Sequence, residues 1–254
     1  MNSPLWVTLG LVATLLFAGT SAHPDDTRIV DGDVIHISQA PYIVQLRIGT
    51  QPFCGGTLVH PEIVVTAAHC FDSLTPELMA HLKIVGGANT RTDEGVQRRV
   101  VSMIKSGTYN KQTLNTDVAV LKLESPMVGK YIRTVPLCSA PPEQGDLVQI
   151  SGWGHTSFEG VGSHDLLTIR IPTVTRQQCQ RYYGIPITNY MFCANGGSKD
   201  SCQGDSGGPA ILFGELCGIV SFGAGCASGA PGVYADVYNL REFINNAMDS
   251  LLKK

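Results

Sequence analysis

Short apolar stretches, each bounded by glycine, proline, asparagine or aspartate, recur along most of the chain. Many of their residues are β-branched, which is typical of strands rather than of helices. Several short strands separated by turn residues favour a β-sandwich or a β-barrel. The clearest stretches are residues 42–48, 57–59, 63–66, 118–123, 147–150 and 217–221.

The C-terminus has a different pattern. Apolar residues recur three and four positions apart from Val237 to Leu251, which is the spacing of one face of an α-helix. Lys253 and Lys254 would suit the negative end of that helix. We expect the helix to pack back onto a barrel.

No internal repeat, low-complexity segment or linker rich in serine and proline divides the chain. A boundary between two barrels must therefore lie in a short connection, which we place near residues 133–142. The length of 254 residues suits one large domain or two small ones, and 43% apolar residues are enough for a sizeable core.

The charge distribution excludes two kinds of partner. The formal net charge is -3, and the longest basic runs are the pairs Arg98–Arg99 and Lys253–Lys254. Nucleic acids and anionic membranes both attract basic patches, so we expect neither as a partner.

The extreme N-terminus resembles a secretory signal peptide. A run of uncharged, mostly apolar residues extends from Leu5 to Ala18, and small residues follow it up to Ala22. Such a run is too short to span a bilayer comfortably, and we expect cleavage after Ala22 and a secreted, extracellular protein. The alternative is a buried N-terminal helix, but the apolar residues of the run form no single face.

The eight cysteines form an even set, which in a secreted protein indicates disulfides. Zinc is the competing interpretation. However, the chain has no Cys-x-x-Cys pair, and His69 and Cys70 are adjacent, unlike the ligands of common zinc sites. Spacing alone leaves the connectivity open, because eight cysteines allow about 105 pairings.

One segment has the composition of a nucleophile loop. Ser206 lies between glycines in residues 204–209, where the backbone can bend sharply and approach a ligand. A serine needs a neighbouring base to become a good nucleophile, and His69 is the leading candidate among the seven histidines. The histidine in turn needs an acid to hold its tautomer, and Asp117, at the start of an apolar stretch, is a candidate for this role. Each residue also has a structural interpretation: a serine in a glycine turn, a core histidine and a strand cap. Taken separately, each structural interpretation is at least as convincing as the functional one. Taken together, the three residues favour the functional interpretation.

Residues 65–70 (VTAAHC), 117–121 (DVAVL), 151–154 (SGWG) and 204–209 (GDSGGP) together resemble the chymotrypsin-like serine proteases, and the trypsins most of all. The resemblance covers nearly all of residues 29–254, and the motifs occur in the order His, Asp, Ser. It implies an all-β fold of two antiparallel six-stranded β-barrels with a C-terminal helix, and with the active site between the barrels.

The resemblance also implies the roles of the residues. Ser206 would attack the scissile carbonyl, His69 would take and return its proton, and Asp117 would orient the imidazole. The backbone amides of Gly204 and Ser206 would form the oxyanion hole. This chemistry needs no cofactor and no metal.

Substrate choice would depend on Asp200, which matches the acid at the base of the trypsin specificity pocket. Gly223 and Gly232 match the pocket walls, and Ser201 lies beside Asp200. Because a buried carboxylate is unfavourable without a cation, this pocket implies cleavage after Arg or Lys. The alternative for Asp200 is a solvated carboxylate in a loop.

Residues 28–32 resemble a zymogen activation junction. Cleavage after Arg28 would free the amine of Ile29, which would pair with Asp205. Residues 23–28 would then be the propeptide and residues 29–254 the peptidase domain. Arg28 fits the predicted specificity, so the enzyme could activate itself.

The resemblance assigns three disulfides, Cys54–Cys70, Cys179–Cys193 and Cys202–Cys226. Cys138 and Cys217 are left over, and parity suggests that they pair with each other. Many trypsins bind calcium at the position of residues 86–95, but Gly87 stands where a ligand glutamate is expected, so calcium binding is doubtful.

The chain is therefore expected to be a secreted serine endopeptidase made as a zymogen. Its partners would be protein or peptide substrates with Arg or Lys before the cut, together with protein inhibitors, and we expect a monomer. The alternative is a non-catalytic protease homologue acting as a binding module, which the presence of His69, Asp117 and Ser206 argues against.

Overall fold

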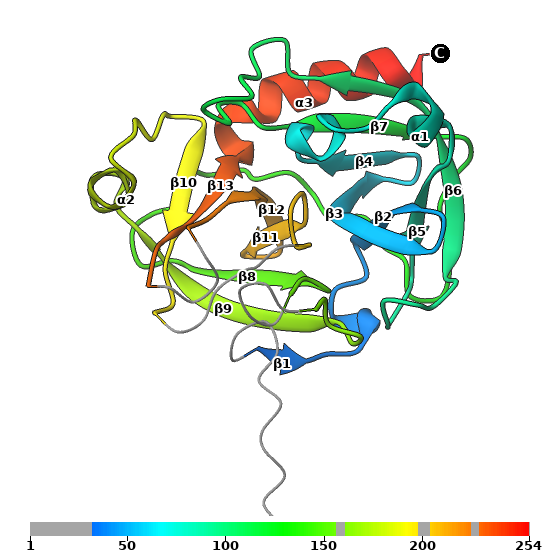
Figure 1. The fold of residues 1–254 in the computed structure, drawn as a ribbon, viewed down its shortest axis with the longest axis horizontal. Coiled ribbons are helices and arrows are strands. Elements are labelled where there is room, and N and C mark those ends of the chain that lie inside the picture. Colours follow the sequence, from blue (N-terminus) through cyan, green and yellow to red (C-terminus); the bar gives the residue numbers. More distant parts are fainter. Residues whose placement is uncertain (1–31, 156–160, 198–203, 225–228, 254) are drawn as a thin grey trace, which may run out of the picture.

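The computed structural model describes residues 32–155, 161–197, 204–224 and 229–253. Two β-barrels lie side by side, and a long helix crosses the top of the view in Figure 1. The expected signal peptide and propeptide, Arg28 and Ile29, Asp200 and Ser201, and Cys202 and Cys226 all lie outside the described residues.

The first barrel is a closed ring of six antiparallel strands in the order β2-β3-β4-β7-β6-β5. Side chains from several strands fill its interior and leave no space beside Gly56. A Cβ on Gly56 would lie 3.1 Å from side-chain atoms of Leu46 and Val44 and 2.8 Å from Val64. The strands are β2 (Ile43–Ile48), β3 (Gln51–His60), β4 (Ile63–Thr66), β5 (Leu82–Gly86), β6 (Val96–Lys105) and β7 (Ala119–Leu123).

The second barrel has the order β9-β10-β13-β12-β11-β8, and a further pairing of β9 with β8 closes the ring. The short strand β1 (Asp33–Val34) joins the edge of β9, so the start of the described chain lies on the second barrel. The strands of the ring are β8 (Leu147–Gly152), β9 (Leu167–Val174), β10 (Met191–Ala194), β11 (Pro209–Leu212), β12 (Glu215–Phe222) and β13 (Gly232–Asp236). The prediction of two six-stranded antiparallel barrels is confirmed.

The C-terminal helix α3 (Val237–Leu252) begins at Asp236, whose side chain accepts a hydrogen bond from the backbone N–H of Asn239. Its apolar face is buried against strands of both barrels, among them β7 and β12. The predicted helix and its packing onto a barrel are confirmed, although α3 contacts both barrels and not one.

The sequence analysis did not predict the shorter helices. The helix α2 (Arg176–Tyr183) has a capping box between Thr175 and Gln178 and ends at Gly184 with φ +66°. Only Cys179 of this helix is buried, so the sequence shows no periodic apolar face from which α2 could have been predicted. The others are α1 (Pro76–Ala80) and the 3₁₀ turns η1 (Ile37–Gln39) and η2 (Ala68–Phe71).

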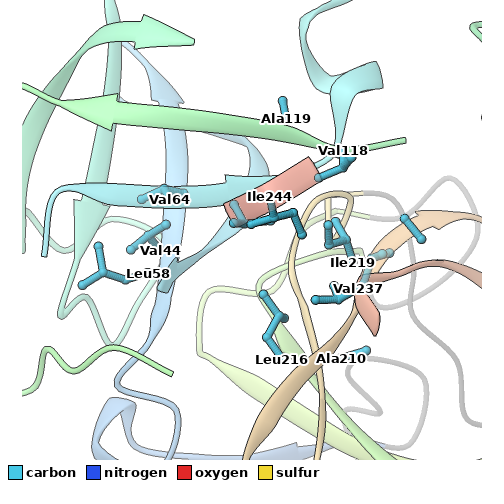
Figure 2. Close-up of a cluster of buried hydrophobic side chains, with 14 of the residues drawn as sticks. Val44, Leu58, Val64, Val118, Ala119, Ala210, Leu216, Ile219, Val237 and Ile244 are labelled. Atoms are coloured by element: carbon cyan, nitrogen blue, oxygen red, sulfur yellow. The ribbon is translucent and has the colours of Figure 1, made fainter. Parts of the chain in front are cut away.

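One hydrophobic cluster extends through both barrels. Figure 2 shows Val64 of the first barrel, Ile219 of the second and Ile244 of α3 gathered in the same cluster. The barrels are therefore joined by a shared core.

The connection between the barrels runs from the end of β7 to the start of β8 and includes residues 133–142. Within it, Cys138 forms a disulfide with Cys217 of β12, and its backbone N–H donates to the Leu216 carbonyl at 3.0 Å. The connection is thus covalently attached to the second barrel. In the described part of the chain, no helix has the length and apolar character needed to cross a membrane.

Candidate active site

His69 and Asp117 meet because two strands of the first barrel pair with each other. Strands β4 and β7 are antiparallel, and Thr66 faces Ala119 at one end of the pair. His69 lies in the turn η2 just after β4, and Asp117 lies just before β7, so both residues lie at the same end. The imidazole Nδ1 of His69 is 2.7 Å from Oδ2 of Asp117, although 48 residues separate the two in the chain.

Asp117 is fully buried and accepts hydrogen bonds with both of its oxygens. The backbone N–H of His69 donates to Oδ1 at 2.9 Å. The hydroxyl of Ser221, on β12 of the second barrel, donates to Oδ2 at 2.6 Å. These donors compensate for the removal of a carboxylate from water, and they fix its orientation toward the imidazole.

The position of His69 is fixed from its backbone as well. The following residue, Cys70, forms a disulfide with Cys54 on β3.

The side chain of His69 keeps 22% of its surface exposed, whereas that of Asp117 is fully buried. Because the carboxylate can only accept, Nδ1 carries the proton and Nε2 is left as the acceptor on the exposed side.

Ser206 lies in a tight loop held against the first barrel. Its carbonyl accepts a hydrogen bond from the N–H of Gly55 at 2.8 Å, and Sγ of Cys70 lies 3.9 Å from the same oxygen. Gly207, with φ +78°, fits so closely that a Cβ there would lie 2.6 Å from the carbonyl oxygen of Gly55. The loop therefore brings Ser206 to the turn that carries His69.

Asp205, the residue before Ser206, points into the protein. It is 1% exposed, and its Oδ1 accepts a hydrogen bond from the N–H of Gly154 at 2.9 Å. The carboxylate occupies the space where a side chain on Gly152 or Gly154 would have to go. The Gly-Trp-Gly segment of the sequence is thus required by close packing.

The expected pocket walls lie at one end of the β12–β13 hairpin. Phe222 faces Val233 across this pair, which places Gly223 and Gly232 close to each other. Tyr183 of α2 supports this end: its hydroxyl donates to the Pro231 carbonyl at 2.5 Å, and its ring packs edge-on against Phe222.

The sequence analysis missed the contribution of Ser221. Nothing in the sequence distinguishes Ser221 from the other serines, because its hydrogen-bond partner Asp117 lies 104 residues away in the other barrel. Tyr183 was missed for a similar reason, since α2 was not predicted.

The loop where many trypsins bind calcium is closed by its own hydrogen bonds. The Asp93 carboxylate accepts from the N–H groups of Asn89 and Thr90 and from the Thr90 hydroxyl, at 2.7 to 2.9 Å. Burial alone would raise the pKa of Asp93, but these donors outweigh it and hold the pKa below its usual range. The donors are protein groups, so the observed geometry explains Asp93 without a bound cation.

Two other groups of residues have atoms close enough to hold a metal ion in the described residues, Cys54–His69–Cys70 and Cys138–Glu215–Cys217. In both groups the two cysteines form a disulfide with each other. Disulfide sulfurs are not thiolates, so neither group suits a metal.

Three of the disulfides expected from the sequence are present, Cys54–Cys70, Cys138–Cys217 and Cys179–Cys193. Cys138–Cys217, which only parity had suggested, joins two buried residues whose Cα atoms are 4.7 Å apart.

Comparison with known proteins agrees with this arrangement. A family profile described as Trypsin matches residues 29–244. Seminase of Drosophila melanogaster is 40% identical over 234 residues, covering 90% of this chain and 84% of that protein. A trypsin of Xenopus laevis is 39% identical over 247 residues, covering 94% of this chain and 98% of that protein. Among solved structures, the mouse brain serine protease neuropsin has a TM-score of 0.78 at 29% identity, covering 86% of this chain and 99% of neuropsin.

Proposed function

The chain belongs to the trypsin family of serine proteases, and we propose that it is a secreted endopeptidase that hydrolyses peptide bonds after Arg or Lys. We further propose that it is made as a zymogen, with a signal peptide at residues 1–22, a propeptide at residues 23–28 and a peptidase domain at residues 29–254. Cleavage between Arg28 and Ile29 would activate it.

The observation that carries the proposal is the His69–Asp117 pair. A fully buried carboxylate holds the imidazole by its Nδ1 atom and also binds the backbone N–H of the same residue. This double attachment keeps the proton on Nδ1 and presents Nε2 as a base. A histidine with a purely structural role has no need of a buried carboxylate fixed by three donors.

In the proposed mechanism, Nε2 of His69 removes the proton of Ser206 as the hydroxyl attacks the scissile carbonyl. The backbone amides of Gly204 and Ser206 stabilise the developing negative charge. Gly204 has φ +94°, a conformation that a side chain would strain, and this supports a role for its amide in a sharply bent loop. His69 then returns the proton to the leaving amine, while the acyl group stays bound to Ser206. A water molecule activated by His69 then attacks this acyl group and releases the carboxylic acid.

The proposed preference for Arg and Lys depends on Asp200, with Ser201 as its neighbour. The glycines Gly223 and Gly232 lie at one end of the β12–β13 hairpin, and the resemblance to trypsins makes them the walls of the pocket. A carboxylate at the base of such a pocket is stabilised by a cationic substrate and disfavours a neutral one.

Activation would act through Asp205. Its carboxylate is buried next to Ser206 and accepts a hydrogen bond from the N–H of Gly154. The amine of Ile29, freed by cleavage after Arg28, would supply a cation for this carboxylate and order the oxyanion loop.

The test uses the full chain cut after Arg28 and compares hydrolysis of peptides that differ only in having Arg, Lys, Phe or Ala before the cut. We expect hydrolysis of the Arg and Lys peptides, its loss in Ser206→Ala, and a loss of the preference in Asp200→Ser. Hydrolysis of Phe or Ala peptides instead would support protease activity but would contradict the assignment of Asp200 to a pocket for Arg or Lys. If no peptide is hydrolysed while Ile29 is the free N-terminus, the chain is a non-catalytic binding module.

A further inference from the structure

A hollow of about 150 Å³ lies next to the oxyanion loop, between the two barrels. Phe53 and Cys54 of β3 line it from the first barrel, and His155 and Gly204 line it from the second. Its volume is far above the about 10 to 15 Å³ that a single water requires, so a short side chain of a ligand fits.

Arg91 supplies the positive charge of this hollow. Its backbone is fixed by a hydrogen bond from its N–H to the His164 carbonyl at 2.6 Å. Its guanidinium packs against Gly162, where a Cβ would collide with it, and its Nη2 reaches the Pro52 carbonyl at 3.4 Å. Within the described part of the chain Arg91 forms no ion pair, so most of its five donors are available to a ligand.

His155 also lines the hollow. Its Nδ1 is buried and has no hydrogen-bond partner among the described residues. Its ring lies against the oxyanion loop, with Cδ2 at 4.0 Å from the position that a Cβ on Gly204 would take.

The surroundings of Arg91 carry charges of both signs. Burial lowers the pKa of Arg47, the charge of Asp93 opposes this, and the charge of Arg91 lowers it further. The side chain of Arg47 donates to the carbonyl oxygen of Arg91 at 2.9 Å, so the two arginines are neighbours. The Asp205 carboxylate also borders the hollow, but it is bound to the N–H of Gly154.

The location of the hollow relative to Ser206 indicates which part of a substrate would enter it. The proposed pocket for Arg or Lys lies at the end of β12 near Gly223, on the side of the acyl group. Phe53 and Cys54 lie on the other barrel, beyond Gly204. A peptide whose carbonyl oxygen is held at Gly204 therefore extends its leaving part toward the hollow.

We propose that this hollow binds an acidic side chain of the substrate, an Asp or Glu within the first two residues after the cut, with Arg91 as the specificity-determining residue. The inference rests on the proposed function. The guanidinium would hold the carboxylate through two parallel hydrogen bonds, which a neutral amide of the same shape cannot match.

The test measures kcat/KM of the activated full chain for pairs of peptides that are identical except for Glu or Gln at the first or the second position after the cut. We expect the Glu peptide to be favoured about fivefold or more at one of these positions, as for a partly buried charge-assisted pair. The Glu/Gln ratio should fall toward one in Arg91→Gln and recover in part in Arg91→Lys. The matched control is Arg98→Gln, which changes an arginine of β6 outside the hollow and should keep the ratio.

A salt titration of the unmodified protein provides a measurement that needs no variant. The Glu/Gln ratio should decrease as the Debye length shrinks from about 10 Å at 0.1 M to about 3 Å at 1 M ionic strength. A ratio of one or less at low salt would overturn the inference, as would a ratio that persists in Arg91→Gln. If neither member of any pair is hydrolysed, the failure belongs to the proposed function and removes the basis of this inference too.

Discussion

The hydroxyl of Ser221 donates a 2.6 Å hydrogen bond to Oδ2 of Asp117 across the boundary between the two barrels. The same oxygen lies 2.7 Å from Nδ1 of His69. A single buried oxygen thus connects the proposed base, carried by the first barrel, to β12 of the second.

Replacing Ser221 with alanine would remove one of the donors that stabilise this carboxylate. We expect the free energy of unfolding to fall by about 1.5 to 3 kcal/mol and kcat/KM for an Arg peptide to fall by about tenfold. Urea unfolding and steady-state kinetics measure the two effects. Ser139→Ala is the control, because Ser139 also donates to a carboxylate, that of Glu215, but at the exposed surface. Equal effects in the two variants would contradict a special role for Ser221.

Gly154→Ala should disable the enzyme and destabilise the fold by about 1 to 3 kcal/mol. The added methyl group would collide with the Asp205 carboxylate, which must then move together with the neighbouring Ser206 and the oxyanion loop. We expect kcat to fall by about 10²-fold, the lower end of the effect of losing an oxyanion donor. Gly107→Ala is the control, because a Cβ there meets nothing within 4 Å. Unchanged kcat in Gly154→Ala would show that Asp205 does not need this geometry.

The disulfides should differ in their contribution to stability. Cys138–Cys217 closes a loop of 79 residues, and Cys179–Cys193 closes one of 14. Because a disulfide restricts the unfolded chain more when its loop is longer, replacing Cys138 and Cys217 with alanine should destabilise the protein by about 1.5 kcal/mol more than the same change at Cys179 and Cys193. Urea unfolding of the two double variants measures this difference. The reverse order would mean that packing of the buried sulfurs outweighs chain entropy.

Asp72 should stabilise the fold in a pH-dependent way. Burial by itself would raise the pKa of Asp72, but hydrogen bonds from Tyr109 at 2.7 Å and Lys105 at 3.2 Å outweigh it and hold the pKa below its usual range. The stabilisation is therefore fully present above the unfolded pKa of about 3.9 and is lost as the pH falls through the lower folded value.

The variant Asp72→Asn tests this effect. We expect it to be less stable than the unmodified protein by about 1 to 2 kcal/mol at pH 6, and the difference to shrink below about pH 4. Urea unfolding between pH 2.5 and pH 6 gives the two curves, with the exposed Asp33→Asn as control. A difference that stays constant with pH would assign the effect of Asp72 to packing.

Much of the fold was predictable because its signals are local. The strands β2, β4 and β7 are rich in apolar residues, which in β2 and β4 are mostly β-branched, and the helix α3 keeps its apolar period over four turns. The helix α2 was not predictable in this way, because it buries one residue and depends on caps at Thr175 and Gly184.

The residues that are chemically suited to the site could be identified from the amino-acid sequence. Ser206 lies between glycines, and His69 and Asp117 occur in segments that resemble those of known serine proteases. Three relationships became visible in the folded chain alone: β4 and β7 pair so that His69 meets Asp117, Ser221 reaches Asp117 from the other barrel, and Arg91 lies beside the oxyanion loop. The physical reason is that strand pairing and the shared core bring together residues far apart in the chain, and no local pattern carries information about such contacts.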